Sequence, residues 1–403
     1  MTEHVYRRRI KSWINAALSK NRLSLNELIR HLPGVDPDLV AEHVEGDDRI
    51  VQATNVARSN EPSHSLRFPV PHPLDYDWRF VADSRQLLLD RVLALTRPQD
   101  HVILVGAPTV FRAAVEHGFP RDMTLIDRNG YIGGPQFLTL PRRVITVDVT
   151  TDEIPCTTGA LVITDPPWYE EYSKAFLWAA ARLTALGGTV LLSAPPLGTR
   201  PGIEEEWIRM KSFASEIGLD FISSEQVLRY RMPPFERNAL RAAGHGNVEA
   251  DWRPGMLWTF SRTSATPTAD RPLVLAKRHE WADRSMSGVR FRIRRRLEIF
   301  SRDPRLRTLV SGDVLDSVSR RDPRRSAVDV WTSGNRVFGC AATDLLLTIV
   351  DAISTSAPII CAVERSLGRT LTEEERDHIA ATEDRVIEIV QRETTEYVND
   401  WEG

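Results

Sequence analysis

Short, almost wholly apolar runs alternate with helical patterns across the middle of the chain, and this alternation restricts the fold most. The runs lie at 101–105, 123–127, 143–148, 160–165 and 189–193, and two further strands are predicted at 219–223 and 256–261. Continuous apolar runs of this length are typical of parallel strands that are buried on both faces. The alternation therefore predicts an α/β fold, a Rossmann-like and mostly parallel sheet with helices on both faces.

The segments between these runs have apolar residues at helical spacing. Helices are predicted near Ser84–Ala94, through Phe111–His117, from Phe176 to Leu183, and at 203–217. Gly187-Gly188 is predicted to end the third of these helices, because glycine is common just past a helix C-terminus. The α/β domain is expected to span residues 74–262.

Residues 1–60 are predicted to form a separate helical module. Ser24 and Glu27 have the spacing of a capping box, and Asp36-Pro37 is a typical start for a third helix. Three short helices with a tight turn fit a helix-turn-helix that contacts nucleic acid, and they equally fit a docking or dimerisation bundle. The proline-rich stretch 51–73 has the composition of a linker.

Residues 272–403 are predicted to form a C-terminal α+β domain whose charge is divided. Residues 277–325 are basic and residues 329–403 are acidic. Within 290–296, arginines alternate with apolar residues, which predicts a strand with one arginine-rich face. That face suits a nucleic-acid phosphate backbone, or else it pairs with the acidic end of the same chain. Thr372 begins a capping box before a final amphipathic helix.

The composition excludes several classes of protein. Cys156, Cys340 and Cys361 form no CxxC pair and have no histidine cluster nearby, so we expect neither a disulfide framework nor a zinc site. The basic N-terminus has no apolar segment after it and does not resemble a signal peptide. No run approaches the roughly 18 apolar residues that span a bilayer. We expect a cytoplasmic protein without a membrane partner; the oligomeric state stays open.

In an open parallel sheet, ligands bind at the carboxyl ends of the strands. The residues that follow the predicted strands are Gly106, Asp127, Asp148, Asp165-Pro166-Pro167-Trp168 and Ser193–Pro196. We expect the functional site among them.

The run Asp165-Pro166-Pro167-Trp168 suits the binding of an amine. Two prolines fix the backbone and lack N–H groups, so their carbonyls and the Asp165 carboxylate present acceptors to an amino group. Trp168 and Tyr169 offer aromatic faces for stacking a planar base. An amine held in this way is oriented toward an electrophile, and positioning is a large part of such catalysis. The expected alkyl donor is a sulfonium, because nothing in the sequence indicates a metal or a covalent nucleophile.

The run from Val162 to Trp168 resembles the (D/N)PP(Y/F/W) motif of the N6-adenine and other amino-methyltransferases, which are class I S-adenosylmethionine-dependent enzymes. The resemblance covers about residues 85–262. It implies S-adenosyl-L-methionine as cofactor and an exocyclic amino group, most simply adenine N6 in nucleic acid, as acceptor. It also implies that Asp165 and the Pro166 carbonyl bind the amino group while Trp168 stacks on the base.

The same resemblance assigns the cofactor side of the site. Asp127 stands about 20 residues after Gly106, where an acid binds ribose hydroxyls in this family and in dinucleotide folds. Asp148 corresponds to an acid that faces the adenine amino group, and Gly106 and Ala107 form the turn beside the cofactor. The family's E/D-x-G-x-G-x-G loop is reduced here to one glycine, and Pro108 has no N–H. The methionine moiety is therefore expected to be held differently.

Residues outside these motifs are candidates on composition alone. Arg200, in the proline-rich stretch 195–202, suits a phosphate or carboxylate, or is simply a solvated arginine. Trp78 and Arg79 are candidates for closing over the pocket from the N-terminal side.

Two other functions fit the same pattern. A helical module before an unpermuted Rossmann domain with a D-P-P-aromatic loop also resembles the branched-chain polyamine synthases, which transfer an aminopropyl group from decarboxylated S-adenosylmethionine. That family has an acid-rich turn after the first strand, whereas this chain has Gly106-Ala107-Pro108. The reduced glycine loop also fits a catalytically inactive methyltransferase fold that serves as a binding module. The intact Asp165–Trp168 run argues against an inactive site.

Overall fold

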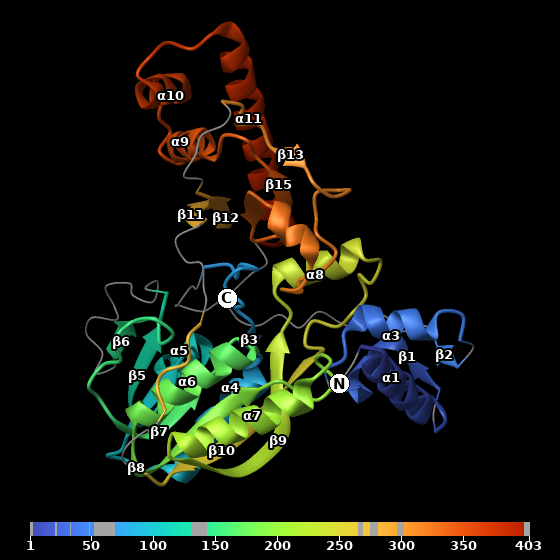
Figure 1. Ribbon diagram of the computed structural model, residues 1–403, viewed down its shortest axis with the longest axis vertical. Coiled ribbons are helices and arrows are strands. Elements are labelled where there is room, and N and C mark those ends of the chain that lie inside the picture. Colours follow the sequence, from blue (N-terminus) through green and yellow to red (C-terminus); the bar gives the residue numbers. More distant parts are fainter. Residues whose placement is uncertain are drawn as a thin grey trace.

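The computed structural model describes residues 3–20, 22–32, 34–47, 49–51, 69–129, 143–264, 269–274, 281–295 and 302–398. It has three parts: N-terminal helices (dark blue), a central sheet with its helices (light blue through green to gold) and a C-terminal region (orange to red) at one end of the molecule (Figure 1).

The central sheet has the strand order β3-β9-β10-β8-β7-β4-β5-β6. Its strands are β3 (Arg79–Phe80), β4 (His101–Val105), β5 (Asp122–Asp127), β6 (Arg143–Thr146), β7 (Gly159–Thr164), β8 (Thr184–Ala194), β9 (Leu219–Arg231) and β10 (Arg253–Arg262). The strands from β8 to β6 are parallel, whereas β10 is antiparallel to both of its neighbours. The Rossmann-like, mostly parallel sheet predicted from the sequence is confirmed.

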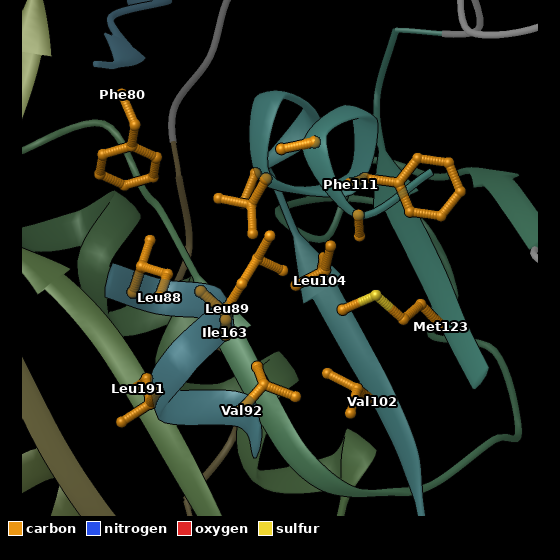
Figure 2. Close-up of a cluster of buried hydrophobic side chains, with 14 of the residues drawn as sticks. Phe80, Leu88, Leu89, Val92, Val102, Leu104, Phe111, Met123, Ile163 and Leu191 are labelled. Atoms are coloured by element: carbon orange, nitrogen blue, oxygen red, sulfur yellow. The ribbon is translucent and has the colours of Figure 1, made fainter. Parts of the chain in front are cut away.

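Two helices cover each face of this sheet. The helices α4 (Ala82–Leu95) and α5 (Pro108–Glu116) pack on one face, and α6 (Glu170–Leu183) and α7 (Ile203–Glu216) pack on the other. Alternate residues of β4 supply the two cores: Val102 and Leu104 join the first, and Ile103 and Val105 join the second. Figure 2 shows side chains of the first core, among them Leu88 from α4, Leu104 from β4 and Phe111 from α5. Strand β4 is therefore apolar throughout because both of its faces are covered.

The prediction that Gly187-Gly188 ends a helix was wrong. Helix α6 ends at Leu183, and both glycines lie inside β8 at a bulge in its pairing with β7. Gly187 has a positive φ of 77°, and a Cβ on Gly188 would lie 2.7 Å from the carbonyl oxygen of Ala160. Gly188 thus allows a close approach of β8 to β7, whereas a Cβ on Gly187 would have open space, and only its positive φ favours glycine there.

The N-terminal module consists of α1 (Glu3–Leu18), α2 (Leu25–His31) and α3 (Pro37–Val44), with a short parallel pair of β1 (Leu23–Ser24) and β2 (Ile50–Val51). The predicted capping box at Ser24 and the Asp36 cap are confirmed. The apolar core of the module includes Leu240 and Trp252 of the central part, beside α8 (Pro234–Ala242). The module therefore packs on the central domain through a shared core.

The C-terminal region is α+β, as predicted. Its antiparallel sheet has the order β11-β12-β14-β15-β13, with β11 (Trp281–Met286), β12 (Val289–Arg294), β13 (Arg307–Thr308), β14 (Val330–Thr332) and β15 (Val337–Gly339). The helical elements are η3 (Pro323–Ala327), α9 (Thr343–Ser354), α10 (Ile359–Leu367), α11 (Glu373–Glu393) and η4 (Thr394–Val398). The Thr372 capping box and the predicted arginine-bearing strand, now β12, are confirmed.

The end of the predicted linker is buried. Val70 and His72 lie in the interior, as does Asp75 just beyond the predicted linker, and the His72 ring is hydrogen-bonded at 3.0 Å to the carbonyl oxygen of Trp331 in β14. Residues 52–68 of the predicted linker lie outside the described residues. Residues 69–75 thus run between the central and C-terminal parts as packed structure.

No helix in the described part of the chain is both long and apolar enough to cross a membrane. Among the same residues, no group of three or more His, Cys, Asp or Glu side chains is arranged to hold a metal ion.

Candidate active site

A cavity opens at the carboxyl ends of the parallel strands, where the sequence placed the site. It encloses about 1120 Å³, counting the part that is open to solvent. The predicted residues that line it are Gly106, Asp127, Asp148, Asp165, Pro166, Pro167, Trp168, Tyr169 and Arg200. The fold therefore brings together nine of the ten residues chosen from the sequence. The tenth, Ala107, packs its side chain into the core behind the turn.

Asp165 is fixed at the end of β7 by contacts on both its backbone and its side chain. Its N–H donates to the carbonyl oxygen of Val105 at 3.0 Å, and its Oδ1 accepts a hydrogen bond of 2.7 Å from the hydroxyl of Tyr230 in β9. That hydroxyl also shares a short hydrogen bond with Ser193 at the end of β8. The carboxylate is therefore positioned by two strands other than its own.

Burial raises the pKa of the Asp165 carboxyl to about 7, against the hydrogen bonds from Tyr230 and Ser193, which lower it. Burial and the nearby Asp165 hold the pKa of Tyr230 well above its usual range, so this hydroxyl stays protonated and donates. A carboxyl that titrates near neutral pH suits a group that accepts a proton during a reaction.

The rest of the reactive loop is a tight turn with aromatic walls. The Tyr169 N–H donates to the Pro167 carbonyl at 2.7 Å, which fixes the turn before α6. The Trp168 indole N–H donates to Ser193 Oγ at 3.2 Å, and its ring stands edge-on to Tyr230 with centroids 5.2 Å apart. Tyr169 faces Tyr76, with centroids 5.4 Å apart. The loop thus carries two aromatic residues, Trp168 and Tyr169, that line the same cavity as the Asp165 carboxylate.

Gly106 lets the first strand turn directly against this loop. Its φ is +66°, and its N–H donates to the Ile126 carbonyl at 2.9 Å. A Cβ at this position would lie 2.9 Å from Phe176 Cε1 and 3.1 Å from the Asp165 carbonyl oxygen. The single glycine left in the loop is therefore required by the close packing of β4 and β7 at the floor of the cavity.

Two further carboxylates stand at the ends of β5 and beyond β6. Asp127 Oδ1 accepts from the Asn129 N–H at 2.8 Å, and burial raises the pKa of the Asp127 carboxyl to about 6. Asp148 Oδ1 accepts from the N–H of Thr150 at 2.8 Å. Both acids line the cavity beside the apolar side chains of Ile126 and Val149. This wall offers acceptors to hydroxyl or amino groups and an apolar surface to a ring.

The arginines of the cavity wall are paired with acids. Arg200 forms a two-point ion pair with Glu206 while its guanidinium lies over the Tyr169 ring at 5.5 Å. Arg253 is ion-paired with Glu236 and lies over Trp78 at 5.0 Å. By contrast, Asp127 and Asp165 accept their hydrogen bonds from uncharged groups. The unbalanced charge of the cavity is therefore negative.

Several lining residues carried little or no sequence signal. Trp78 lines the cavity as suggested, but its neighbour Arg79 turns away and binds Asp77 and the Pro69 carbonyl. Tyr230, Tyr172 and Phe176 come from a long strand and a helix whose patterns only report burial. The hydrophobic periodicity of a helix or strand indicates which face is buried, but it does not indicate which residues a buried side chain contacts.

The arginine-rich face of β12 contacts acids of this chain. Arg290 and Arg292 both pair with Asp75 and Asp283, at distances of 2.7–3.0 Å. Arg284 in β11 pairs with Asp351, which lies in the acidic half of the region. The arginine-rich face therefore pairs within this chain, but its observed partners are Asp75, in the predicted central domain, and Asp283, and neither lies in the acidic end at 329–403.

Together these features define a Rossmann-like α/β protein with an acidic, aromatic-walled cavity at the carboxyl ends of its strands. No protein-family model matches the chain, and no curated protein matches it. Among solved structures, it is similar to the branched-chain polyamine synthase of Thermus thermophilus in complex with N4-aminopropylspermidine and 5′-methylthioadenosine. The identity is 14%, the match covers 66% of this chain and 90% of that one, and the TM-score is 0.49.

Two S-adenosylmethionine-type methyltransferases are further structural neighbours. The N-methyltransferase NodS of Bradyrhizobium japonicum WM9 has 12% identity, with 45% of this chain and 98% of that chain covered and a TM-score of 0.31. A TehB-like SAM-dependent methyltransferase of Corynebacterium glutamicum has 12% identity, with 45% and 89% covered and a TM-score of 0.32.

Proposed function

We propose that the protein uses S-adenosyl-L-methionine to methylate an amine nitrogen that is held at Asp165. An exocyclic amino group such as adenine N6 is the acceptor that the Asp165–Trp168 loop favours. One observation carries this proposal: the half-buried Asp165 carboxylate, held by Tyr230 at 2.7 Å, lines the same cavity as Asp127 at the end of β5. An acceptor for an amine and an acceptor for a ribose therefore share one cavity.

The residues around Asp127 fit a nucleoside-bearing cofactor. The Asp127 carboxylate suits ribose hydroxyls, and Asp148 suits an amino group at the far end of the same wall. Ile126 and Val149 supply the apolar surface that an adenine ring covers. When bound, such a cofactor supplies an electrophilic carbon on a sulfonium.

The chain's own groups orient the amine and take up its proton. Asp165 Oδ1 accepts from Tyr230, but an ionised carboxylate has about four acceptor sites, so Asp165 keeps acceptor capacity for the amine. Trp168 and Tyr169 both line the cavity, and in this proposal their rings hold a planar acceptor by stacking. Because the pKa of Asp165 is about 7, the carboxyl can release as well as take up a proton near neutral pH.

Binding and transfer are tested in two steps. Calorimetric titration with S-adenosyl-L-methionine should show saturable binding, and labelled methyl groups should pass to adenine-containing oligonucleotides with the wild type and not with Asp165→Asn. Cofactor binding without transfer to any nucleic acid would remove adenine N6 as acceptor. Absence of cofactor binding at millimolar concentration would contradict the proposal as a whole and favour the alternative of an inactive fold that serves as a binding module.

A second candidate is aminopropyl transfer to a polyamine, and the charge of the cavity favours it. Asp127 and Asp165 have uncharged hydrogen-bond donors, whereas Arg200 and Arg253 are neutralised by Glu206 and Glu236. A cationic acceptor gains from such a cavity, and a polyanionic one loses. Replacing the methyl donor by decarboxylated S-adenosylmethionine and adding spermidine tests this function. A product heavier by one aminopropyl group would establish it, and an unchanged polyamine would exclude it for that acceptor.

Nucleic acid as a partner is proposed on the charge of residues 277–325 and on the N-terminal helices. Arg290 and Arg292 are engaged with acids of this chain, so the contact would fall to other basic residues of that segment, such as Arg321. A binding constant that falls steeply with salt concentration would support this partner. Binding that is undetectable at low salt would exclude it.

A further inference from the structure

A short segment that lines the cavity at one end also contacts the C-terminal region. We call residues 69–78 the strap; Asp75, Tyr76, Asp77 and Trp78 at its end all line the cavity. Tyr76 has a φ of +55°, in the left-handed region that residues with a side chain seldom adopt. Its ring stands 5.4 Å from that of Tyr169 and 6.0 Å from that of Tyr172. The strap is thus held in an unfavourable backbone conformation where it touches the reactive loop.

Asp75 is the residue that holds the strap. Arg290 Nη1 lies 2.7 Å from Asp75 Oδ2, and Arg292 Nη2 lies 2.8 Å from Oδ1. Two arginines of β12 in the C-terminal sheet therefore bind both carboxylate oxygens. Arg290 also donates to the Val70 carbonyl at 3.1 Å, earlier in the strap. Burial by itself would raise the pKa of the Asp75 carboxyl, but these arginines and Arg128 together hold it well below its usual range.

The third cation on Asp75 comes from the cofactor side of the cavity. Arg128 follows Asp127 directly, and its Nη2 donates to the Asp75 carbonyl at 2.9 Å and to Asp75 Oδ1 at 3.2 Å. One buried carboxylate therefore joins three segments: β12 of the C-terminal region, the strap, and the turn after β5. Removal of one arginine would leave the buried Asp75 carboxylate with fewer positive partners. Because an unpaired buried charge is costly, we expect the cluster to rearrange when a member is lost.

We propose that Asp75 is a positioning residue: gripped by Arg290 and Arg292, it fixes Tyr76 against the reactive loop and Arg128 beside Asp127. The C-terminal region is then a required part of the site and not an appended module. The strained backbone at Tyr76 supports this, because strain of this kind persists only where surrounding contacts over-determine it. The proposal rests on the proposed function in one respect: the binding test uses S-adenosylhomocysteine, a ligand chosen because of that function.

The test compares two arginines of the same C-terminal sheet. Arg292→Met removes one cation from Asp75, whereas Arg284→Met removes a cation that pairs with Asp351 inside the C-terminal region. We expect amide hydrogen exchange in residues 69–78 to rise at least tenfold in Arg292→Met and to stay at the wild-type rate in Arg284→Met. Affinity for S-adenosylhomocysteine should fall about tenfold in the first variant only. Arg292→Lys keeps the positive charge but lacks the planar guanidinium group. We expect it to restore part of the exchange protection of the strap and part of the affinity for S-adenosylhomocysteine.

The two readouts separate the positioning role from the proposed function. If the wild type does not bind S-adenosylhomocysteine, the proposed function fails, while exchange in the strap still decides the role of Asp75. Wild-type exchange of the strap in a folded Arg292→Met protein would overturn the positioning role. If Arg292→Met does not fold, Arg292→Gln, which also removes the cation from Asp75, takes its place, and wild-type exchange of the strap in that variant would overturn the role equally.

Discussion

The hydroxyl of Tyr230 in β9 donates a 2.7 Å hydrogen bond to Oδ1 of Asp165 at the end of β7. Two strands, β10 and β8, separate β9 from β7 in the sheet order. The bond reaches across because the long β9 ends beside the reactive loop, where the Tyr230 ring packs against Trp168. This contact ties the group that is proposed to take the proton to a strand at the opposite side of the cavity.

The pH dependence of transfer should follow Asp165. Because ionised Asp165 accepts the proton and its pKa is about 7, activity should rise as pH increases through 7. Tyr230→Phe removes a hydrogen bond that lowers this pKa, so the rising limb should move to higher pH. Rates measured across that range in both proteins check this, with Tyr172→Phe as a matched change in the same cavity. If the rise of activity with pH in Tyr230→Phe occurs at the same pH as in the wild type, Asp165 is not the group that titrates.

Asp127→Ala should weaken cofactor binding by at least tenfold, because a carboxylate that holds ribose hydroxyls contributes charge-assisted hydrogen bonds of roughly 1.5–3 kcal/mol. Asp122→Ala is the matched control, since Asp122 stands at the other end of the same strand and is exposed. Calorimetric titration with S-adenosylhomocysteine measures both. Equal affinities in the two variants would place the ribose elsewhere.

Gly106→Ala should destabilise the protein more than Gly118→Ala does. Both glycines have a positive φ, +66° and +60°, so both substitutions cost about 1 kcal/mol from backbone strain. Only at Gly106 does the new Cβ also meet neighbours, Phe176 and the Asp165 carbonyl, whereas Gly118 has open space. We expect a further loss of about 1–3 kcal/mol for overpacking. Urea unfolding measures the difference, and equal losses would mean that the floor of the cavity adapts.

The N-terminal module should stabilise the loop that carries Arg200. The Tyr6 hydroxyl donates to the Gly198 carbonyl at 2.7 Å in a buried contact. Tyr6→Phe leaves that carbonyl without its donor and should cost about 1–3 kcal/mol of unfolding free energy. Arg9→Ala removes a more exposed ion pair between α1 and Glu204 in α7 and should change stability by less than about 1 kcal/mol. Thermal denaturation of both variants compares them; a loss in Arg9→Ala as large as in Tyr6→Phe would refute this view.

The sequence by itself determined the sheet and the position of the site. Local patterns specify a strand such as β4, because an apolar run that is covered on both faces has few other structures open to it. The site follows from topology, since parallel strands end at one edge and bring Gly106, Asp127 and Asp165 to it. The helix caps at Ser24 and Thr372 were equally readable, because a capping box involves only four consecutive residues.

Only the tertiary structure decided which groups surround those residues. Tyr230 reaches Asp165 from 65 positions away, and Arg292 reaches Asp75 from 217 positions away. No local pattern predicts these pairs, because their members come together only after the strands and helices that carry them have packed. The same reason explains the two departures, Gly187-Gly188 inside a strand and residues 69–75 in the interior. Glycine and proline indicate only which backbone conformations are allowed locally. The neighbouring strand or domain determines which of these conformations the chain adopts.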